Sequence, residues 1–570
     1  MAVTEPKPYI RKENDIFTYL GTGEFGEKAH GLINTLTHLN QSFPNNEFEG
    51  IEIFIPKSLV ILSDVFLQFM EENCLWDLAL SDLPDEHIAQ IFQKASLPTL
   101  LSGDLYEYAS QTTYPLAVRS SSILEDSLNE PFAGVYHTKM LPNWYLDPQI
   151  RFQKLVQAVK LIWSSVYTQS AKQYFQAIKR DIRTERMAVL IQEVVGKRYE
   201  DRYYPAISGV ARSYNYYAYQ DHKPEDGIIN LALGLGKTIV DGENVWQYSP
   251  TRPASPPPFS MNDILQNTQS SFYSIHMGER IDYDPINPDE FMNVNYLDTA
   301  ERDGTIQYCG RLYQDGMEDS DNAPWLVDFS PVLVYDVMPL NRLLQKLLKI
   351  CEKLYGLKVE IEFALTIDDN DKARFGFLQV RPMIMQGGSI EVKKEAHDNV
   401  LLYSENVLGN GFTDDITDIL MIKREKFDPK DSYAIAKEID SFNRDFLDQD
   451  RRYLLITYGR LGSSDPWLGI PLDWSSIAKV SVIVESSLPG FNPELSQGSH
   501  FFHNLLAFQV KYFSLPESEM NDLDYKWLDS LPVNKNGKYL KHIVLEEPML
   551  IQVDGRKRKG IIYKRRSKTT

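Results

Sequence analysis

Arg119 and Ser120 follow an apolar run and carry side chains that suit the binding of phosphate oxygens. An arginine presents a planar fork of N–H donors that matches a phosphate group. Ser121 and Ser122 come next, and a glycine-containing segment that ends at Thr138 could bring backbone N–H groups to the same anion. The alternative to a phosphate-binding site is a strand and a polar hairpin that happen to contain an arginine. These residues alone do not distinguish the two interpretations.

Carboxylate, amide and guanidinium side chains gather on two strands expected later in the chain. Glu360 and Glu362 alternate along the first strand and therefore share one face of it. Gln379 and Arg381 stand near the end of the second strand. Mg²⁺ binds hard oxygen ligands together with substrate phosphates, and Glu362 and Gln379 supply such oxygens. Arg381 could clamp a phosphate with two hydrogen bonds. The alternative is a charged hairpin exposed to solvent.

A glycine-rich turn near the N-terminus has the pattern G-x-G-x-x-G at Gly21, Gly23 and Gly26. This pattern marks a dinucleotide-binding fold when an acidic residue follows about 20 residues later, at the end of a strand. Here Glu47 and Glu49 lie near that distance, but they precede the next expected strand. The glycine pattern alone therefore does not predict that fold.

Taken together, these segments resemble the ATP-grasp nucleotide domain of the phosphoenolpyruvate synthase and pyruvate phosphate dikinase family. The resemblance covers about residues 15–385. The matching segments stand in the family's order: V-R-S-S at 118–121, E-D at 125–126, F-A-G at 132–134, S-G-V at 208–210, I-E-F at 361–363 and L-Q-V-R-P at 378–382.

The resemblance implies ATP and Mg²⁺ as ligands and gives roles to individual residues. Lys28 stands where the family's G-G-K-x-x-x-L opening has a mobile lysine that reaches the ATP phosphates. Gln192, in an apolar strand, stands where the family has a glutamine beside the adenine. Glu362 and Gln379 correspond to the metal ligands, and Glu360 is a neighbour. The alternatives are a helix-capping lysine in solvent for Lys28 and a solvent-facing polar residue on a core strand for Gln192.

In this interpretation Arg119, Ser120, Thr138 and Arg381 hold the triphosphate. The two arginines are also the expected catalytic residues, because catalysis would consist of positioning and charge neutralisation. The chain departs from the family at Lys237, which replaces the glutamate of a G-L-G-E loop. That replacement changes the phosphate or metal environment.

The C-terminal part also departs from the family, which passes the phosphoryl group to a histidine on a swivelling domain and then to pyruvate in a large barrel. The chain ends at residue 570, too soon after Arg381 for that barrel, and lacks the family's G-G-x-x-S/C-H-A-A-I carrier motif. His500, after a Gly-Ser turn, is the candidate phosphoryl acceptor, with His503 one helical turn further on. Packing between aromatic side chains is the alternative for both. A loop at 458–471, rich in glycine and serine and containing Arg460, suits an anion or a phosphorylated group.

The elements that would position these residues alternate between strands and helices. We expect an α/β (α+β) fold, with an ATP-grasp domain in two subdomains at 15–195 and 196–386 and a separate α/β domain at 400–570. The expected helices are 58–73, 155–178, 340–354 and 431–447. The expected strands are 51–55, 186–195, 207–210, 228–231, 359–365, 375–380, 401–406, 452–457 and 480–485.

Composition excludes several classes of function. The 570 residues carry a net charge of -20, which disfavours nonspecific binding to nucleic acid or an anionic membrane. Three dispersed cysteines form neither a disulfide framework nor a zinc pattern, and no run approaches the roughly 20 apolar residues of a membrane helix. The polar N-terminus lacks the apolar core of a signal peptide, so we expect a cytoplasmic protein. A basic cluster at 556–559 is expected at a hairpin tip; contact with nucleic acid is the alternative.

Two functions from different classes remain open. The first is a Mg²⁺-dependent phosphotransferase that moves a phosphoryl group from ATP to His500, a small molecule or a partner protein. The second is a regulatory module that binds ATP without transferring it. Lys237 and the missing carrier motif favour the module, whereas Glu362, Gln379 and Arg381 together favour the enzyme.

Overall fold

The computed structural model describes most of the 570-residue chain. The described residues are 11–13, 16–42, 48, 50–122, 135–178, 180–216, 222–255, 264–265, 267–280, 282–313, 323–368, 372–383, 392, 398–463, 465–472, 474–491, 505, 510–555 and 557–565.

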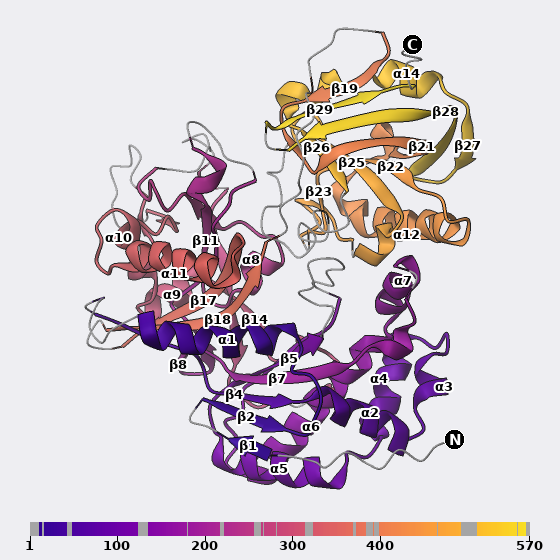
Figure 1. Ribbon diagram of the computed structural model, residues 1–570. Helices are drawn as coiled ribbons and strands as arrows, with labels where there is room; N and C mark the ends of the chain where they lie inside the picture. The colour runs from indigo at the N-terminus through magenta and orange to yellow at the C-terminus, as the bar shows by residue number, and fades with distance from the viewer. Residues whose placement is uncertain are drawn as a thin grey trace.

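The N-terminal part forms a mixed sheet covered by helices, at the bottom of Figure 1. The strand order is β1 (Arg11–Glu13), β2 (Phe17–Leu20), β4 (Ser58–Ile61), β7 (Met187–Glu193), β5 (Leu116–Ser122) and β6 (Thr138–Leu141). The helices of this part are α2 (Ser63–Glu72), α3 (Trp76–Ala79), α4 (Asp85–Lys94), α5 (Thr99–Gln111), α6 (Pro148–Ser164) and α7 (Gln169–Ala177). Helix α6, which carries the buried Trp163, packs on β5 and against α4 and α5.

A second sheet stands beside the first and takes one strand from the N-terminal part. Its order is β12 (Trp246–Tyr248), β11 (Ile228–Leu233), β10 (Ile207–Arg212), β17 (Val359–Ile367), β18 (Ala373–Pro382) and β3 (Ile51–Phe54). Strand β3 runs parallel to β18, with Glu52 opposite Arg374. Helix α1 (Glu27–Ser42) packs on β18, on β5 and on α11 (Leu340–Tyr355), so it contacts both sheets (Figure 1).

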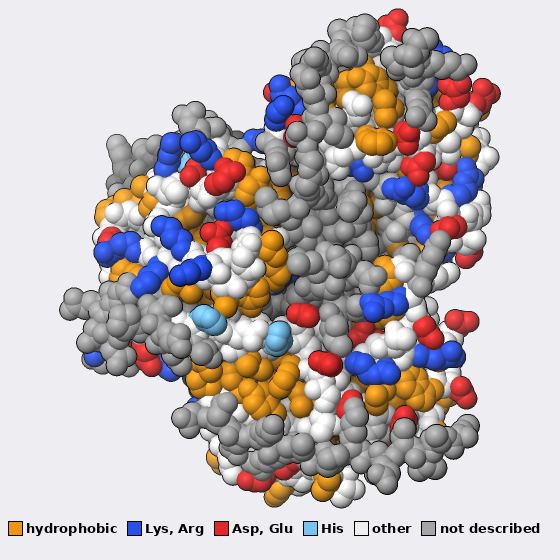
Figure 2. Space-filling model, viewed as in Figure 1, with side chains coloured by type: hydrophobic (Ala, Val, Ile, Leu, Met, Phe, Trp, Pro, Cys, Tyr) orange, Lys and Arg blue, Asp and Glu red, His pale blue; other side chains and the backbone are white. Residues whose placement is uncertain are grey.

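Smaller elements complete this half of the molecule. A further sheet has the order β14 (Met292–Tyr296), β13 (Ser271–His276), β9 (Arg202–Tyr204) and β8 (Lys197–Tyr199), and β15 (Arg311–Leu312) pairs with β16 (Trp325–Leu326). The short helices are α8 (Lys237–Val240), α9 (Leu297–Arg302) and α10 (Ser330–Leu333). The outer face of α11 is basic (Figure 2), because Arg342, Lys346, Lys349 and Lys353 recur at helical spacing opposite its buried leucines.

The C-terminal part is a sheet-rich domain, at the upper right of Figure 1. Its strand order is β19 (Val400–Ser404), β29 (Lys559–Tyr563), β28 (Leu540–Asp554), β21 (Asn410–Ile422), β22 (Tyr453–Tyr458), β25 (Val480–Ser486), β26 (Lys511–Leu515) and β20 (Val407–Leu408), and β27 (Val533–Asn536) pairs with β28. Its helices include α12 (Ser432–Asp448) and α14 (Tyr525–Ser530).

The large sheet of this domain curls back on itself. Strands β19 and β20 stand at opposite ends of the strand order, yet only two residues separate them. The hydroxyl of Ser404 donates to the carbonyl of Ser514, and the backbone N–H of Ser514 donates to the carbonyl of Asn406. The edge strand β19 is therefore brought beside β26, near the other end of the sheet, which leaves less strand edge open to solvent.

The expectation of a mixed α/β fold is confirmed, but two expected helices were wrong in part. Residues 58–61 form β4 instead of the first turn of a helix, because Leu59, Val60 and Ile61 are buried between β2 and β7. The long helix expected at 155–178 is broken, because Thr168 accepts a hydrogen bond from the N–H of Ala171 and so caps a new helix, α7.

Other expectations hold in the C-terminal domain. The strands expected at 452–457 and 480–485 correspond to β22 and β25, and the helix expected at 431–447 corresponds to α12. Residues 557–559 of the basic cluster lie where β28 turns back into β29, as a hairpin tip requires, and Arg556 lies outside the described residues. None of the helices in the described part of the chain has the length and apolar composition that crossing a membrane requires.

Gly26 holds the start of α1 against β5. Its φ is +71°, and an added Cβ would lie 1.7 Å from the carbonyl oxygen of Ser121. Gly304 has a similar φ of +73°, but nothing lies within 4 Å of its Cβ position. Gly304→Ala should therefore carry only the left-handed backbone cost of about 1 kcal/mol. Gly26→Ala should add overpacking, for a total of roughly 2–5 kcal/mol.

Thermal unfolding of both variants against the unmodified protein measures this difference. An equal loss of melting temperature in both would contradict the close contact between Gly26 and Ser121.

Candidate functional site

A cavity of about 710 Å³ lies between the two six-stranded sheets. One wall comes from β5, β6 and β7, and the facing wall from β10, β17, β18 and the segment around α8. Residues of the C-terminal domain form a further part of the lining. The cavity falls within the size range of sites for small ligands and cofactors.

Arg119 connects the two walls of the cavity. It stands on β5, and its Nη2 donates to Oε1 of Gln379 on β18 at 2.8 Å and to Oε2 of Glu362 on β17 at 3.3 Å. Glu362 and Gln379 lie opposite each other in the ladder between β17 and β18, and the register shifts directly after Glu362. Such a bulge changes the direction in which the neighbouring side chains point.

The structure thus brings together three of the residues selected from the sequence. Arg119 and Glu362 line the cavity, with 15% and 19% of their side chains exposed, and Gln379 lies beside them. A guanidinium, a carboxylate and an amide oxygen within hydrogen-bonding distance form a site that could receive a phosphate and its cation.

Arg381, by contrast, is engaged away from the cavity lining. Its Nε donates to Oε1 of Glu360 at 2.7 Å, and the other carboxylate oxygen accepts from Nε of Arg212. Glu360 is 2% exposed, so two arginines compensate one buried carboxylate. Removing one partner of such a buried ion group is strongly destabilising. The contacts of Arg381 therefore favour a structural role over the phosphate clamp expected from the sequence.

Lys28 and Ser120 are also not among the described residues that line the cavity. Lys28 lies in the first turn of α1 and is 9% exposed, and Ser120 is buried within β5. The turn before α1 is fixed by Ser121, whose hydroxyl donates to the carbonyl of Phe25 and accepts from the N–H of Ala29.

Gln192 and Thr138 do line the cavity. Thr138 lies opposite Arg119 in the pairing of β5 with β6, and Gln192 lies opposite Ala117 in the pairing of β5 with β7. Gln192 is 2% exposed, and its Nε2 has no hydrogen-bond partner among the described residues. A buried amide donor without a partner carries a free-energy cost that a ligand acceptor would remove.

Lys237 is held by two carboxylates in the cavity wall. Its Nζ lies 3.1 Å from Asp241 and 3.5 Å from Asp289. Burial lowers the pKa of Lys237, but the charges and hydrogen bonds of the two aspartates outweigh it and shift that pKa upward. Burial raises the pKa of Asp241, against the opposing effect of Lys237. The charge reversal noted in the sequence is therefore neutralised locally.

The C-terminal domain contributes to the cavity in a way that sequence reasoning missed. Its lining residues are Tyr433, Gly462, Ser463, Pro471, Leu472, Trp474 and Ser475. The composition of the loop at 458–471 predicts only an anion site, because no local sequence pattern shows which distant segment a loop will contact. Asp289 was missed for the same reason.

Several predicted residues lie outside the described part of the chain. These are Glu125, Asp126, residues 132–134, His500 and His503.

Close to the C-terminal lining, Glu485 is a buried carboxyl group. It accepts a hydrogen bond from the N–H of Leu461 at 2.8 Å and another from the hydroxyl of Tyr512. Burial raises the pKa of Glu485 to about 7, although these hydrogen bonds and the charge of Arg460 oppose the shift.

A comparison with protein families matches the model of the pyruvate phosphate dikinase AMP/ATP-binding domain to residues 25–400. An uncharacterised phosphotransferase, YvkC, from Bacillus subtilis is 25% identical over 188 residues, which cover 33% of this chain and 20% of that protein. A phosphoenolpyruvate synthase from Aeropyrum pernix is 26% identical over 210 residues, 33% of this chain and 23% of that protein. A rifampicin phosphotransferase from Streptomyces sviceus is 25% identical over 219 residues, 35% of this chain and 22% of that protein. The chain thus matches about a fifth of the length of these relatives.

The buried Glu485 should make stability fall with rising pH. Its folded pKa of about 7 lies above the ordinary value of 4.5, so the folded state holds the proton more tightly. The stabilisation is present below about pH 4.5 and is lost as pH rises through 7, by up to about 3 kcal/mol. Glu485→Gln removes the titration and keeps an oxygen for Leu461.

Melting temperatures of both proteins between pH 5 and pH 8 test this expectation. The unmodified protein should lose stability relative to Glu485→Gln across that range, and parallel curves would contradict the raised pKa.

Proposed function

The chain belongs to the family of the pyruvate phosphate dikinase AMP/ATP-binding domain, and we propose that it is a Mg²⁺-dependent phosphotransferase that binds ATP between its two six-stranded sheets. The observation that carries this proposal is the contact of Arg119 with Glu362 and Gln379 across the cavity. A guanidinium that could bind a phosphate and two oxygen atoms that could bind a cation meet there from separate sheets.

The donor set fits a magnesium ion that is bound together with a nucleotide. Glu362 offers a carboxylate and Gln379 an amide oxygen, both hard ligands. Among the described residues no cluster of three or more His, Cys, Asp or Glu side chains could hold a metal ion. A Mg²⁺ ion at Glu362 and Gln379 would therefore take its other ligands from phosphate oxygens and water, and it would neutralise phosphate charge.

The remaining cavity residues fit the other parts of ATP. Gln192 has a buried amide nitrogen that lacks a described partner, so an acceptor atom of the adenine would satisfy it. Arg119 would donate to the phosphate oxygens, and the hydroxyl of Thr138, on the neighbouring strand, could donate to the same group. In phosphoryl transfer the protein acts mainly by positioning and by electrostatic stabilisation, and these residues supply both.

The acceptor is the part of the proposal that the family leaves open. The relatives are called a phosphoenolpyruvate synthase, a rifampicin phosphotransferase and an uncharacterised phosphotransferase, so their names do not share one acceptor. For this chain we keep three acceptors: His500, a small molecule, and a histidine of a partner protein. A cytoplasmic location stays a prediction.

The specific observation that favours the second function, an ATP sensor without transfer, is the Lys237 ion group. A lysine stands where the family has a glutamate, and Asp241 and Asp289 both engage it. A wall altered in this way could retain nucleotide binding while the transfer step is lost.

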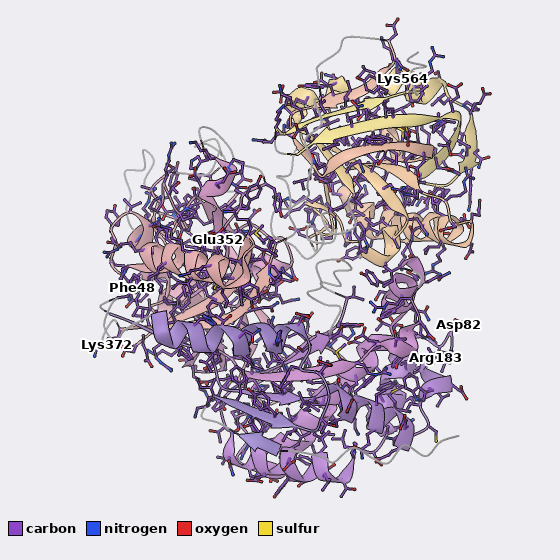
Figure 3. All side chains as sticks on the ribbon, in the orientation of Figure 1. Phe48, Asp82, Arg183, Glu352, Lys372 and Lys564 are labelled. Carbon is purple, nitrogen blue, oxygen red and sulfur yellow. The ribbon has the colours of Figure 1, made fainter. Side chains whose placement is uncertain are left out.

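Glu362→Ala separates the two functions. The protein is incubated with Mg²⁺ and ATP labelled at the β or the γ phosphate, and release of AMP or ADP and acid-labile label on the chain are measured. For an enzyme, the loss of one metal ligand should lower turnover by on the order of 100-fold or more. Glu352→Ala is the control, since Glu352 lies on α11 (Figure 3) and pairs with Lys358 outside the cavity lining.

Turnover by Glu362→Ala at the unmodified rate would contradict the assigned metal site. Tight Mg²⁺-dependent ATP binding without AMP, ADP or label, even with candidate acceptors added, would favour the sensor.

A further inference from the structure

Arg460 joins the C-terminal domain to the cavity wall. It stands on β23 (Arg460–Leu461), is 6% exposed, and its Nη1 donates to the carbonyl of Gly242 at 3.0 Å. The two residues lie 218 positions apart in the chain. Such a contact requires that both the strand carrying Arg460 and the segment carrying Gly242 are held in place. A misplaced guanidinium would be desolvated without a hydrogen-bond acceptor, which costs free energy.

On the receiving side, Gly242 ends the turn that follows α8. The segment from Gly234 to Gly242 begins and ends with glycines at φ of +81° and +72°. Its first part is fixed by the hydroxyl of Ser208, which donates to the carbonyl of Gly234 at 2.7 Å. Its last part receives Arg460. Between these two attachments lie Lys237 and Asp241, which line the cavity.

On the donating side, the strand that carries Arg460 is tightly built. Strand β23 pairs with β24 (Gly469–Ile470), and a Cβ on Gly469 would lie 1.9 Å from the carbonyl oxygen of Arg460. Gly459 has φ of +74°, and its Cβ would lie 2.7 Å from the ring of Phe491. The carboxyl of Glu485 accepts from the next N–H, that of Leu461. These contacts fix the backbone around Arg460 and so restrict the directions in which its side chain can point.

A second contact supports the same placement of the domain. The short helix η8 (Trp474–Ile477) packs against α7, which rises toward the C-terminal domain in Figure 1. Ser170 of α7 and Trp474 and Ser475 of η8 all line the cavity. The C-terminal domain therefore contacts the nucleotide-binding half at two separate places, one on each side of the cavity.

Building on the proposed function, we propose that the C-terminal domain supplies a wall of the nucleotide site and that Arg460 is the positioning residue that maintains it. With its guanidinium on Gly242, Arg460 fixes the end of the 234–242 segment, so Lys237 and Asp241 are held at the cavity before the nucleotide binds. Without that contact, nucleotide binding has to order the segment first, which weakens the affinity.

The first test is the affinity of the full chain for mant-ATP with Mg²⁺, measured by fluorescence. Arg460→Met keeps a long, unbranched side chain but removes the hydrogen-bond donor. It should therefore weaken mant-ATP binding on the order of tenfold, as the loss of one charged hydrogen bond implies. Arg452→Met is the matched control: Arg452 contacts Asp415 and Ser481 within the same domain, outside the cavity lining, and its loss should leave the affinity unchanged.

The second readout is amide hydrogen exchange. Arg460→Met should exchange faster across 234–242, while protection in β22 and β25 stays as in the unmodified protein. Arg460→Lys retains a charged donor and should recover part of both losses. A purely structural defect of the C-terminal domain would instead lower protection in β22 and β25.

The outcomes separate the two proposals. Unchanged mant-ATP affinity and unchanged exchange at 234–242 in a folded Arg460→Met protein would overturn the role of Arg460. If Arg460→Met loses protection in β22 and β25, the Arg460→Lys variant is used instead. The positioning role of Arg460 is then overturned if Arg460→Lys binds mant-ATP and exchanges at 234–242 as the unmodified protein does. If the unmodified protein fails to bind mant-ATP, the proposed function fails, and the exchange comparison still tests Arg460.

Discussion

The structure depends on one side chain that crosses between two sheets. Arg119 extends from β5 to Glu362 and Gln379 on β17 and β18, and the cavity lies where those strands face each other. In this partly buried setting each charge needs the others, because an unpaired guanidinium or carboxylate would carry a large desolvation cost. A nucleotide with its cation could replace these contacts with equivalent ones. The same residues can therefore stabilise the fold through their mutual contacts and also bind the nucleotide.

Two further ion groups keep the walls in place around this contact. Glu360, paired with Arg212 and Arg381, ties β10, β17 and β18 together next to the ligand strands. Lys237, paired with Asp241 and Asp289, fixes the α8 segment of the same wall, where the C-terminal domain attaches. The cavity thus belongs to all three regions of the chain, although the matched family model covers residues 25–400.

The sequence predicted the centre of the site better than its edges. Glu362 and Gln379 could be chosen because alternating strands with charged ends leave a local pattern. Arg381 showed the same pattern, but it pairs with Glu360, and Arg212, which shares that carboxylate, lies on a strand far away in the sequence. Arg460 was named only as part of a loop that suits an anion, and Asp289 was not named, because the importance of both comes from contacts across the fold. The helix expected at 58–73 begins instead with β4, because pairing with β2 and β7 outweighed local helical periodicity.

The central claim is that ATP binds between the two sheets, and photolabelling with 8-azido-ATP in the presence of Mg²⁺ tests it most directly. The azide sits on the adenine, so peptide mapping should find the label in cavity-lining segments near Gln192, between 187 and 195 or between 135 and 141. Excess ATP should prevent the labelling. Label confined to other parts of the chain, or labelling that ATP does not reduce, would contradict the account.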